Sequence, residues 1–204
     1  MYVSMNFDFD KVSKKPLITK LIINIFLWVA EITAVIFLAY FIVHYAIEKT
    51  DMIGASMETT LSNSNPIIIN KFSYRFSDPK RFDVVVFKQS GKEHSYYNIK
   101  RIIGLPGETV LLKEDHIYID GEVIEDIILV EPMVNYGLAK EEILLEENEY
   151  FVLGDNRNNS EDSRFASVGN ILADDIIGKA SIRFSPFNFI NKINLKPDNK
   201  VEEQ

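Results

Sequence analysis

The chain has 204 residues, of which 47% are hydrophobic, and a formal net charge of −8; this length suits one domain plus a membrane anchor. It contains no cysteine, which excludes disulfide bonds, thiol catalysis and cysteine-ligated zinc. Residues 1–50 hold five of the 22 Lys and Arg but only four of the 30 Asp and Glu. Residues 51–204 are therefore acidic and lack the basic face that nucleic-acid binding needs.

The first segment, 1–20, is polar and basic, and a long apolar stretch follows at 21–47. As a helix this stretch would span about 40 Å, more than the roughly 30 Å of a bilayer's hydrocarbon core. It is too long for a cleaved signal peptide, and no small-x-small cleavage site follows closely. Four Lys fall within 11–20, and Lys next to a span marks its cytoplasmic side. We predict a cytoplasmic tail at 1–20, a transmembrane helix at 21–47 in the cell membrane, and an extracytoplasmic domain at 51–190.

Short apolar or alternating runs separated by Gly and Pro turns predict that this domain is mainly antiparallel β. Asp120-Gly121, between two alternating runs, is the signature of a type I′ hairpin. Residues 125–149 are acidic and are expected to form a solvated flap, and 191–204 a loose polar tail. A turn is expected at 89–92, and strands at 66–70, 72–76, 83–87, 96–103, 116–124, 150–153, 171–177 and 178–184.

Three stretches could carry hydrolytic chemistry: Ser56 in a turn after Gly54, Lys100 in an apolar run, and the polar loop 154–164. The three His residues belong to no catalytic motif, and neither Gly-x-Ser-x-Gly nor His-Glu-x-x-His is present. The sequence leaves a Ser-His-Asp triad open, but the candidate base is a Lys. A Lys accepts protons near neutral pH only when burial disfavours its ammonium form. Lys100 fits this requirement, although an ordinary strand Lys would have the same neighbours.

The position of Ser56 suggests a substrate class. It follows the apolar stretch by nine residues, so even an extended chain keeps it within roughly 30 Å of the bilayer. A nucleophile held there would meet membrane-embedded substrates, and secretory precursors are cleaved just after a membrane-buried apolar segment.

Four segments, 56–61, 70–87, 100–108 and 154–164, resemble in this order the signature boxes of bacterial type I signal peptidases. The resemblance extends from the anchor to about Pro186. It implies a membrane-anchored serine endopeptidase with a twisted, SH3-like β domain, which cleaves secretory preproteins after small-x-small sites and uses no metal or cofactor. Gly54 and the short 108–154 stretch resemble the small, single-anchor Gram-positive members.

The resemblance also implies roles for individual residues. Ser56 would be the nucleophile, with its own backbone N–H in the oxyanion hole, and Lys100 would be the general base. Met57 would pack beneath the site, and Ser160 would hydrogen-bond to Lys100 and orient it. The substrate would bind extended along strand edges, with small residues in shallow apolar pockets at the first and third positions before the cut.

Within the polar loop, Asp162 and Arg164 would form a bracing ion pair, and Asp155 and Arg157 would shape the loop. A calcium site is the alternative for this loop, but Arg157 occupies the third position, where an oxygen ligand is required.

Two positions depart from the family pattern: Thr59 stands where Pro is usual, and Phe82 where Gly is usual. Two other functions are weighed against the signal peptidase. A self-cleaving Ser-Lys repressor-type protease is disfavoured by the anchor and by the lack of a DNA-binding module. A catalytically dispensable adaptor in surface-protein assembly would need neither Ser56 nor Lys100.

Overall fold

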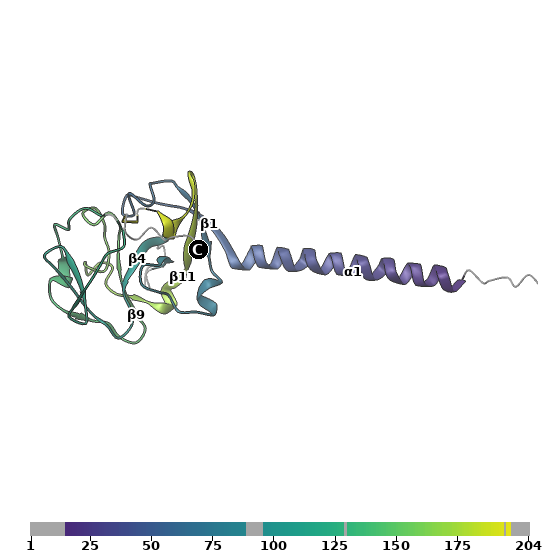
Figure 1. Cartoon of the computed structure of the whole chain (residues 1–204), viewed down its shortest axis with the longest axis horizontal. Coiled ribbons are helices and arrows are strands. Elements are labelled where there is room, and N and C mark those ends of the chain that lie inside the picture. Colours follow the sequence, from purple (N-terminus) through teal and green to yellow (C-terminus); the bar gives the residue numbers. More distant parts are fainter. Residues whose placement is uncertain (1–14, 89–95, 129, 194, 197–204) are drawn as a thin grey trace, which may run out of the picture. The chain divides into compact units, whose positions relative to one another are not determined.

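In a computed structural model of the chain, residues 15–88, 96–128, 130–193 and 195–196 are described. They fall into two compact units, Met1–His44 and Tyr45–Gln204. The first unit contains most of α1 (Lys15–Ala46), the long helix in Figure 1. Its part Ile18–Ala46, 29 residues, is long and apolar enough to cross a membrane. The apolar helix expected at 21–47 is thus formed; it begins at Lys15, and Ile47 opens a strand instead.

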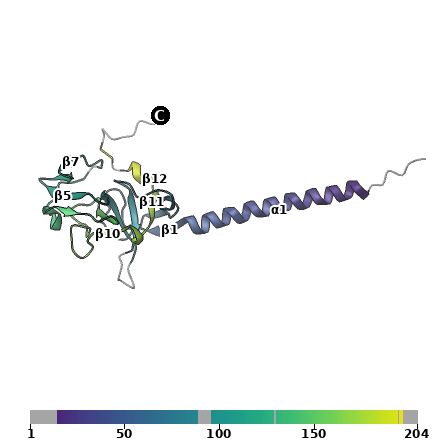
Figure 2. The same ribbon diagram turned by 90° about the horizontal axis from the view of Figure 1, so that it is seen from below.

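The second unit is built from two antiparallel sheets, so the prediction of a mainly β domain after one apolar helix is confirmed. Figure 2 shows β5 and β7 grouped at one side of this unit and β1, β11 and β12 at the other. The larger sheet has the order β1 (Ile47–Asp51), β2 (Pro66–Asn70), β11 (Ile176–Phe184), β3 (Val84–Phe87), β4 (Asn98–Gly104), β9 (Glu149–Leu153) and β10 (Ile171–Leu172), with β12 (Phe187–Phe189) also on β11. The smaller sheet has the order β7 (Glu122–Ile124), β6 (His116–Ile119), β5 (Thr109–Lys113) and β8 (Ile143–Leu144).

The hairpin between β6 and β7 forms as predicted. Its two central residues, Asp120 and Gly121, have φ values of 52° and 82°, and a type I′ turn requires positive φ at both positions.

Two predicted strands are wrong. In place of a strand at 72–76 there is a 3-10 turn, η1 (Ser73–Arg75). The cause is Asn70, whose side-chain oxygen accepts the backbone N–H groups of Phe72 and Ser73 and turns the chain. In place of a strand at 171–177, the two residues of β10 are followed by η3 (Ala173–Asp175), and Ile176 already begins β11. The turn expected at 89–92 lies outside the described residues.

The segment 125–149 is more than a solvated flap. Its Glu side chains are exposed or half-exposed, as expected, but four apolar residues are buried: Ile128, Met133, Ala139 and Leu145. It also contains η2 (Gly137–Lys140). The first part of the expected polar tail also packs against the domain. It begins within η4 (Ile190–Lys192), and Leu195 pairs with Ile128 in an isolated bridge.

Candidate active site

Ser56 lies in the loop that joins β1 to β2. The base of this loop is closed by a hydrogen bond of 2.9 Å from the backbone N–H of Met52 to the carbonyl oxygen of Asn65. Within the loop, the side chains of Met57 and Leu61 are fully buried in the hydrophobic core. Ser56 therefore immediately precedes a residue whose side chain is buried in the core.

Lys100 lies on β4, between β3 and β9 in the larger sheet. Its Nζ donates a hydrogen bond of 2.7 Å to Ser56 Oγ, and the residue is only 5% exposed. Burial lowers the pKa of the Lys100 amine below its ordinary value, against the opposing effect of the acidic groups Asp162, Asp155 and Glu161. The structure thus places a buried amine, with a reduced proton affinity, against a serine hydroxyl.

The polar loop 154–164 reaches this pair because β9 pairs with β4, with Leu153 opposite Arg101. The chain then passes through Gly154, where any Cβ would lie 2.4 Å from the carbonyl oxygen of Ser56 and 2.2 Å from Ser160 Oγ. Real Cβ atoms essentially never show such contacts, so only glycine allows this close approach. The loop and the backbone of Ser56 are therefore in direct contact.

Asn156 ties the same loop to the nucleophile segment. Its backbone N–H donates to the carbonyl oxygen of Ser56 at 3.0 Å, and its side-chain Nδ2 donates to the carbonyl oxygen of Ala55 at 3.1 Å. The family resemblance had assigned no role to this residue.

The hydrogen bond expected between Ser160 and Lys100 is absent. Ser160 Oγ is buried and has no hydrogen-bond partner within the described part of the chain. Lys100 Nζ instead contacts Ser56 Oγ, and Ser160 Oγ lies against Gly154.

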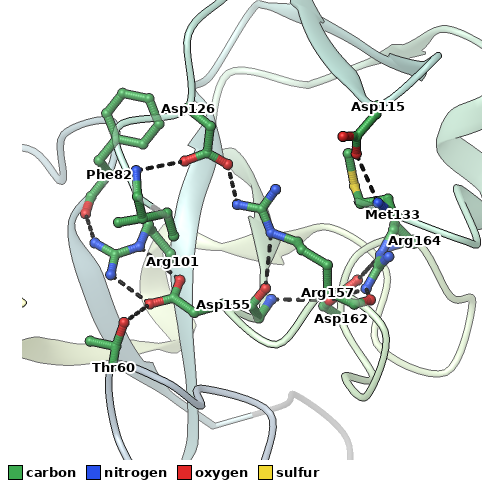
Figure 3. Close-up of polar contacts among 12 residues, drawn as sticks. Thr60, Phe82, Arg101, Asp115, Asp126, Met133, Asp155, Arg157, Asp162 and Arg164 are labelled. Carbon is green, nitrogen blue, oxygen red and sulfur yellow. Dashed lines mark hydrogen bonds and ion pairs between the residues drawn. The ribbon is translucent and has the colours of Figure 1, made fainter. Parts of the chain in front are cut away.

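The ion pair expected between Asp162 and Arg164 is formed, and both side chains are buried (Figure 3). Arg164 Nε donates to Asp162 Oδ1 at 2.8 Å. Arg164 also donates to the carbonyl oxygens of Arg157 at 2.6 Å and Asn135 at 2.8 Å. Asp162 in turn accepts the backbone N–H of Gly154 at 3.0 Å. The pair therefore fixes both ends of the loop.

A second buried ion pair, Arg101 with Asp155, was not expected (Figure 3). Asp155 accepts from Arg101 Nε at 2.8 Å and Nη2 at 2.6 Å, and from Thr60 Oγ1 at 2.6 Å. Burial alone would lower the pKa of the Arg101 guanidinium, but the charge of Asp155 and the hydrogen bonds to it outweigh that effect and raise the pKa. Because Arg101 adjoins Lys100 and Thr60 lies four residues after Ser56, this pair joins the three candidate segments.

A third pair links the loop to the segment expected to be a flap. Arg157 Nη2 contacts Asp126, and Arg157 Nε donates to the carbonyl oxygen of Gly154 at 3.1 Å. In the sequence, nothing near Asp126 identifies it as the partner of Arg157, 31 residues later. Among the described residues, no group of three or more His, Cys, Asp and Glu could hold a metal ion.

Comparison with known proteins adds independent findings. The sequence model of the family described as "Signal peptidase, peptidase S26" matches residues 25–185. A probable signal peptidase I-2 from Synechocystis is 37% identical over 177 residues, which cover 84% of this chain and 77% of that protein. Signal peptidase I T from Bacillus subtilis is 34% identical over 172 residues, or 79% of this chain and 86% of that protein. A solved signal peptidase I from Enterococcus faecalis, 31% identical, matches 52% of this chain and 98% of its own with a TM-score of 0.43.

Proposed function

Because this chain belongs to the peptidase S26 family of signal peptidases, we propose that it is a membrane-anchored serine endopeptidase that removes signal peptides from secretory preproteins. In this proposal Ser56 is the nucleophile and Lys100 the general base. The observation that carries the assignment is the 2.7 Å contact between Lys100 Nζ and Ser56 Oγ, made by a lysine that is 5% exposed.

The chemistry follows from the low proton affinity of the buried amine. Neutral Lys100 takes the proton of the Ser56 hydroxyl as Oγ attacks the carbonyl carbon of the residue before the cut. The tetrahedral intermediate collapses when Lys100 passes that proton to the departing amine. Water, deprotonated by Lys100, then releases the signal peptide from the acyl-enzyme, and Ser56 regains its proton.

The developing oxyanion needs a donor already in place. Within the described residues the backbone N–H of Ser56 donates to no acceptor. The carbonyl oxygen of Ala55, in the same peptide unit, accepts hydrogen bonds from Asn156 Nδ2 at 3.1 Å and from the backbone N–H of Glu58 at 3.1 Å. A peptide unit fixed on one side and free to donate on the other suits this role, as in the family.

We assign the substrate and the location on the same basis. The substrate binds extended, with small residues at the first and third positions before the cut. The apolar helix crosses the bilayer with its Lys-rich N-terminal side in the cytoplasm, so the domain acts on the outer face of the cytoplasmic membrane. There the signal peptide of a preprotein is embedded and its cleavage site is within reach of Ser56.

Cleavage of a preprotein with an Ala-x-Ala site, measured in detergent micelles with the full-length chain, tests the proposal. The wild type should cut after the second Ala, and Ser56→Ala and Lys100→Met should not. Ser62→Ala, in the same loop and exposed, and Lys113→Met, on the surface, are the matched controls and should cut normally. Cleavage by Ser56→Ala would place the nucleophile elsewhere, and no cleavage of several precursors by the wild type would favour the adaptor.

A further inference from the structure

A cavity of about 820 Å³ lies beside the segment that follows the proposed nucleophile. Three segments line it: 58–59, which follows the nucleophile, 155–157 of the polar loop, and 130–132. The first two segments are joined directly, because Asn156 is hydrogen-bonded to the backbone of Ser56 and Ala55. The cavity therefore adjoins the backbone that carries the proposed nucleophile.

The third wall is fixed in place by specific contacts. Asn158 Nδ2 donates to the carbonyl oxygen of Pro132 at 2.9 Å, and Asn158 Oδ1 accepts the backbone N–H of Val134 at 2.9 Å. The Arg157–Asp126 pair holds the chain at residue 126, before this segment, to the polar loop. The cavity is thus bordered by segments that polar contacts hold together.

The charge of the cavity is negative. Asp155 and Arg157 also line it, but each is neutralised by an ion-pair partner, Arg101 and Asp126 respectively.

Two carboxylates remain, those of Glu58 and Glu131. Neither forms a hydrogen bond or ion pair with another described residue. Val130 and Pro132 add apolar surface to the same lining, which suits the alkyl part of a long basic side chain.

We propose that this cavity binds the first residues of the mature chain, after the cut, and favours Lys or Arg there through Glu58 and Glu131. The inference rests on the proposed function. The residues before the cut are small and apolar, and a carboxylate-lined cavity of this size suits them poorly, because burying an unpaired charge against an apolar group is costly. The mature side of the substrate has no such restriction, and a cationic side chain would give both carboxylates a partner.

The test uses full-length protein in detergent and three peptides identical up to an Ala-x-Ala site. Their first two residues after the cut are Lys-Lys, Gln-Gln or Glu-Glu, and kcat/KM is measured for each. We expect the order Lys-Lys, Gln-Gln, Glu-Glu, with steps of up to about fivefold per contact, as for exposed ion pairs. The steps should shrink in high salt, which screens such contacts.

The Glu58→Gln/Glu131→Gln double variant should bring the Lys-Lys to Glu-Glu ratio close to one. The ratio is internal to each variant, so a general loss of activity does not affect it. Glu146→Gln/Glu147→Gln removes the same charge from residues that lie outside this cavity and should keep the wild-type ratio.

Cleavage of the Gln-Gln peptide separates the two hypotheses. If it is cut but the three peptides react equally, or if the double variant keeps the wild-type ratio, the inference is overturned and the proposed function stands. If none of the peptides is cut, both are overturned, since no substrate then occupies the cavity.

Discussion

Replacing Asp155 with Asn would leave the Arg101 guanidinium buried without its counter-charge. Arg101 is 1% exposed and Asp155 3%, so water cannot take the place of the lost carboxylate. Arg101 also cannot lose its proton, because the pKa of the guanidinium is raised in this site. Breaking a buried pair by removing one partner costs about 3–5 kcal/mol. Since whole domains are stable by about 5–15 kcal/mol, Asp155→Asn should remove a large part of the free energy of unfolding.

The measurement is urea unfolding of the domain in detergent. The single Trp, Trp28, belongs to α1, so tryptophan fluorescence does not report on the domain, and the near-ultraviolet circular dichroism of the tyrosines is the suitable signal. Glu114→Gln is the matched control, because its pair with Lys113 is solvent-exposed and should cost about 1 kcal/mol or less.

A variant that lacks both charges completes the argument. Arg101→Met combined with Asp155→Leu removes both charges, and replacing a buried pair by apolar residues is often neutral or stabilising. The double variant should therefore be clearly more stable than Asp155→Asn. If Asp155→Asn unfolds within about 1 kcal/mol of the wild type, below the cost expected for a broken buried pair, the reasoning from burial is refuted.

Three further outcomes are expected. Activity should rise with pH through the lowered pKa of Lys100. The free energy of unfolding should rise over the same range, because between that pKa and 10.5 the unfolded chain binds more protons than the folded one. Lys100→Met should remove this rise in urea unfolding, and a flat pH profile of wild-type activity would contradict the assignment. Phe82 has φ 68°, so Phe82→Gly should be more stable than Phe82→Ala by about 1 kcal/mol; the reverse order in thermal unfolding would show that the backbone is not strained there. Gly154→Ala should lower kcat by about 100-fold, because the added Cβ would displace the backbone of Ser56. Adding Ser160→Gly removes only the clash with the Ser160 side chain and should not restore kcat. An unchanged kcat in Gly154→Ala would mean that the loop moves without displacing Ser56.

Most strands could be predicted because they depend on local patterns. The buried run at 83–87 and the alternating residues around Asp120-Gly121 each indicate their conformation within a few residues. The strand prediction at 72–76 failed because one side chain decided the outcome: Asn70 turns the chain into η1, against the alternation of the following residues.

Of the connections within the candidate site, the sequence predicted the Asp162–Arg164 ion pair but not the pairs that join the separate segments. Matching the family boxes was enough to find Ser56 and Lys100. The pair formed by Arg101 and Asp155 joins residues 54 positions apart, and Thr60 reaches the same carboxylate across 95 positions. Such contacts depend on the register of β4 against β9 and leave no periodic signal in the sequence.

The pairing of β4 with β9 also bears on the order in which the candidate site is assembled. During synthesis β4 is complete by Gly104, but its partner β9 ends only at Leu153 and the loop that follows at Arg164. Until these arrive, β4 has no partner strand on that side, and Lys100 lacks part of the surroundings that bury it in the complete domain. The nascent chain therefore carries Ser56 long before the segments that bury Lys100 have been made. The strand β11, which lies between β2 and β3 in the sheet, is synthesised later still. In the proposed function, the site is therefore complete only when the last long strand of the sheet has been synthesised.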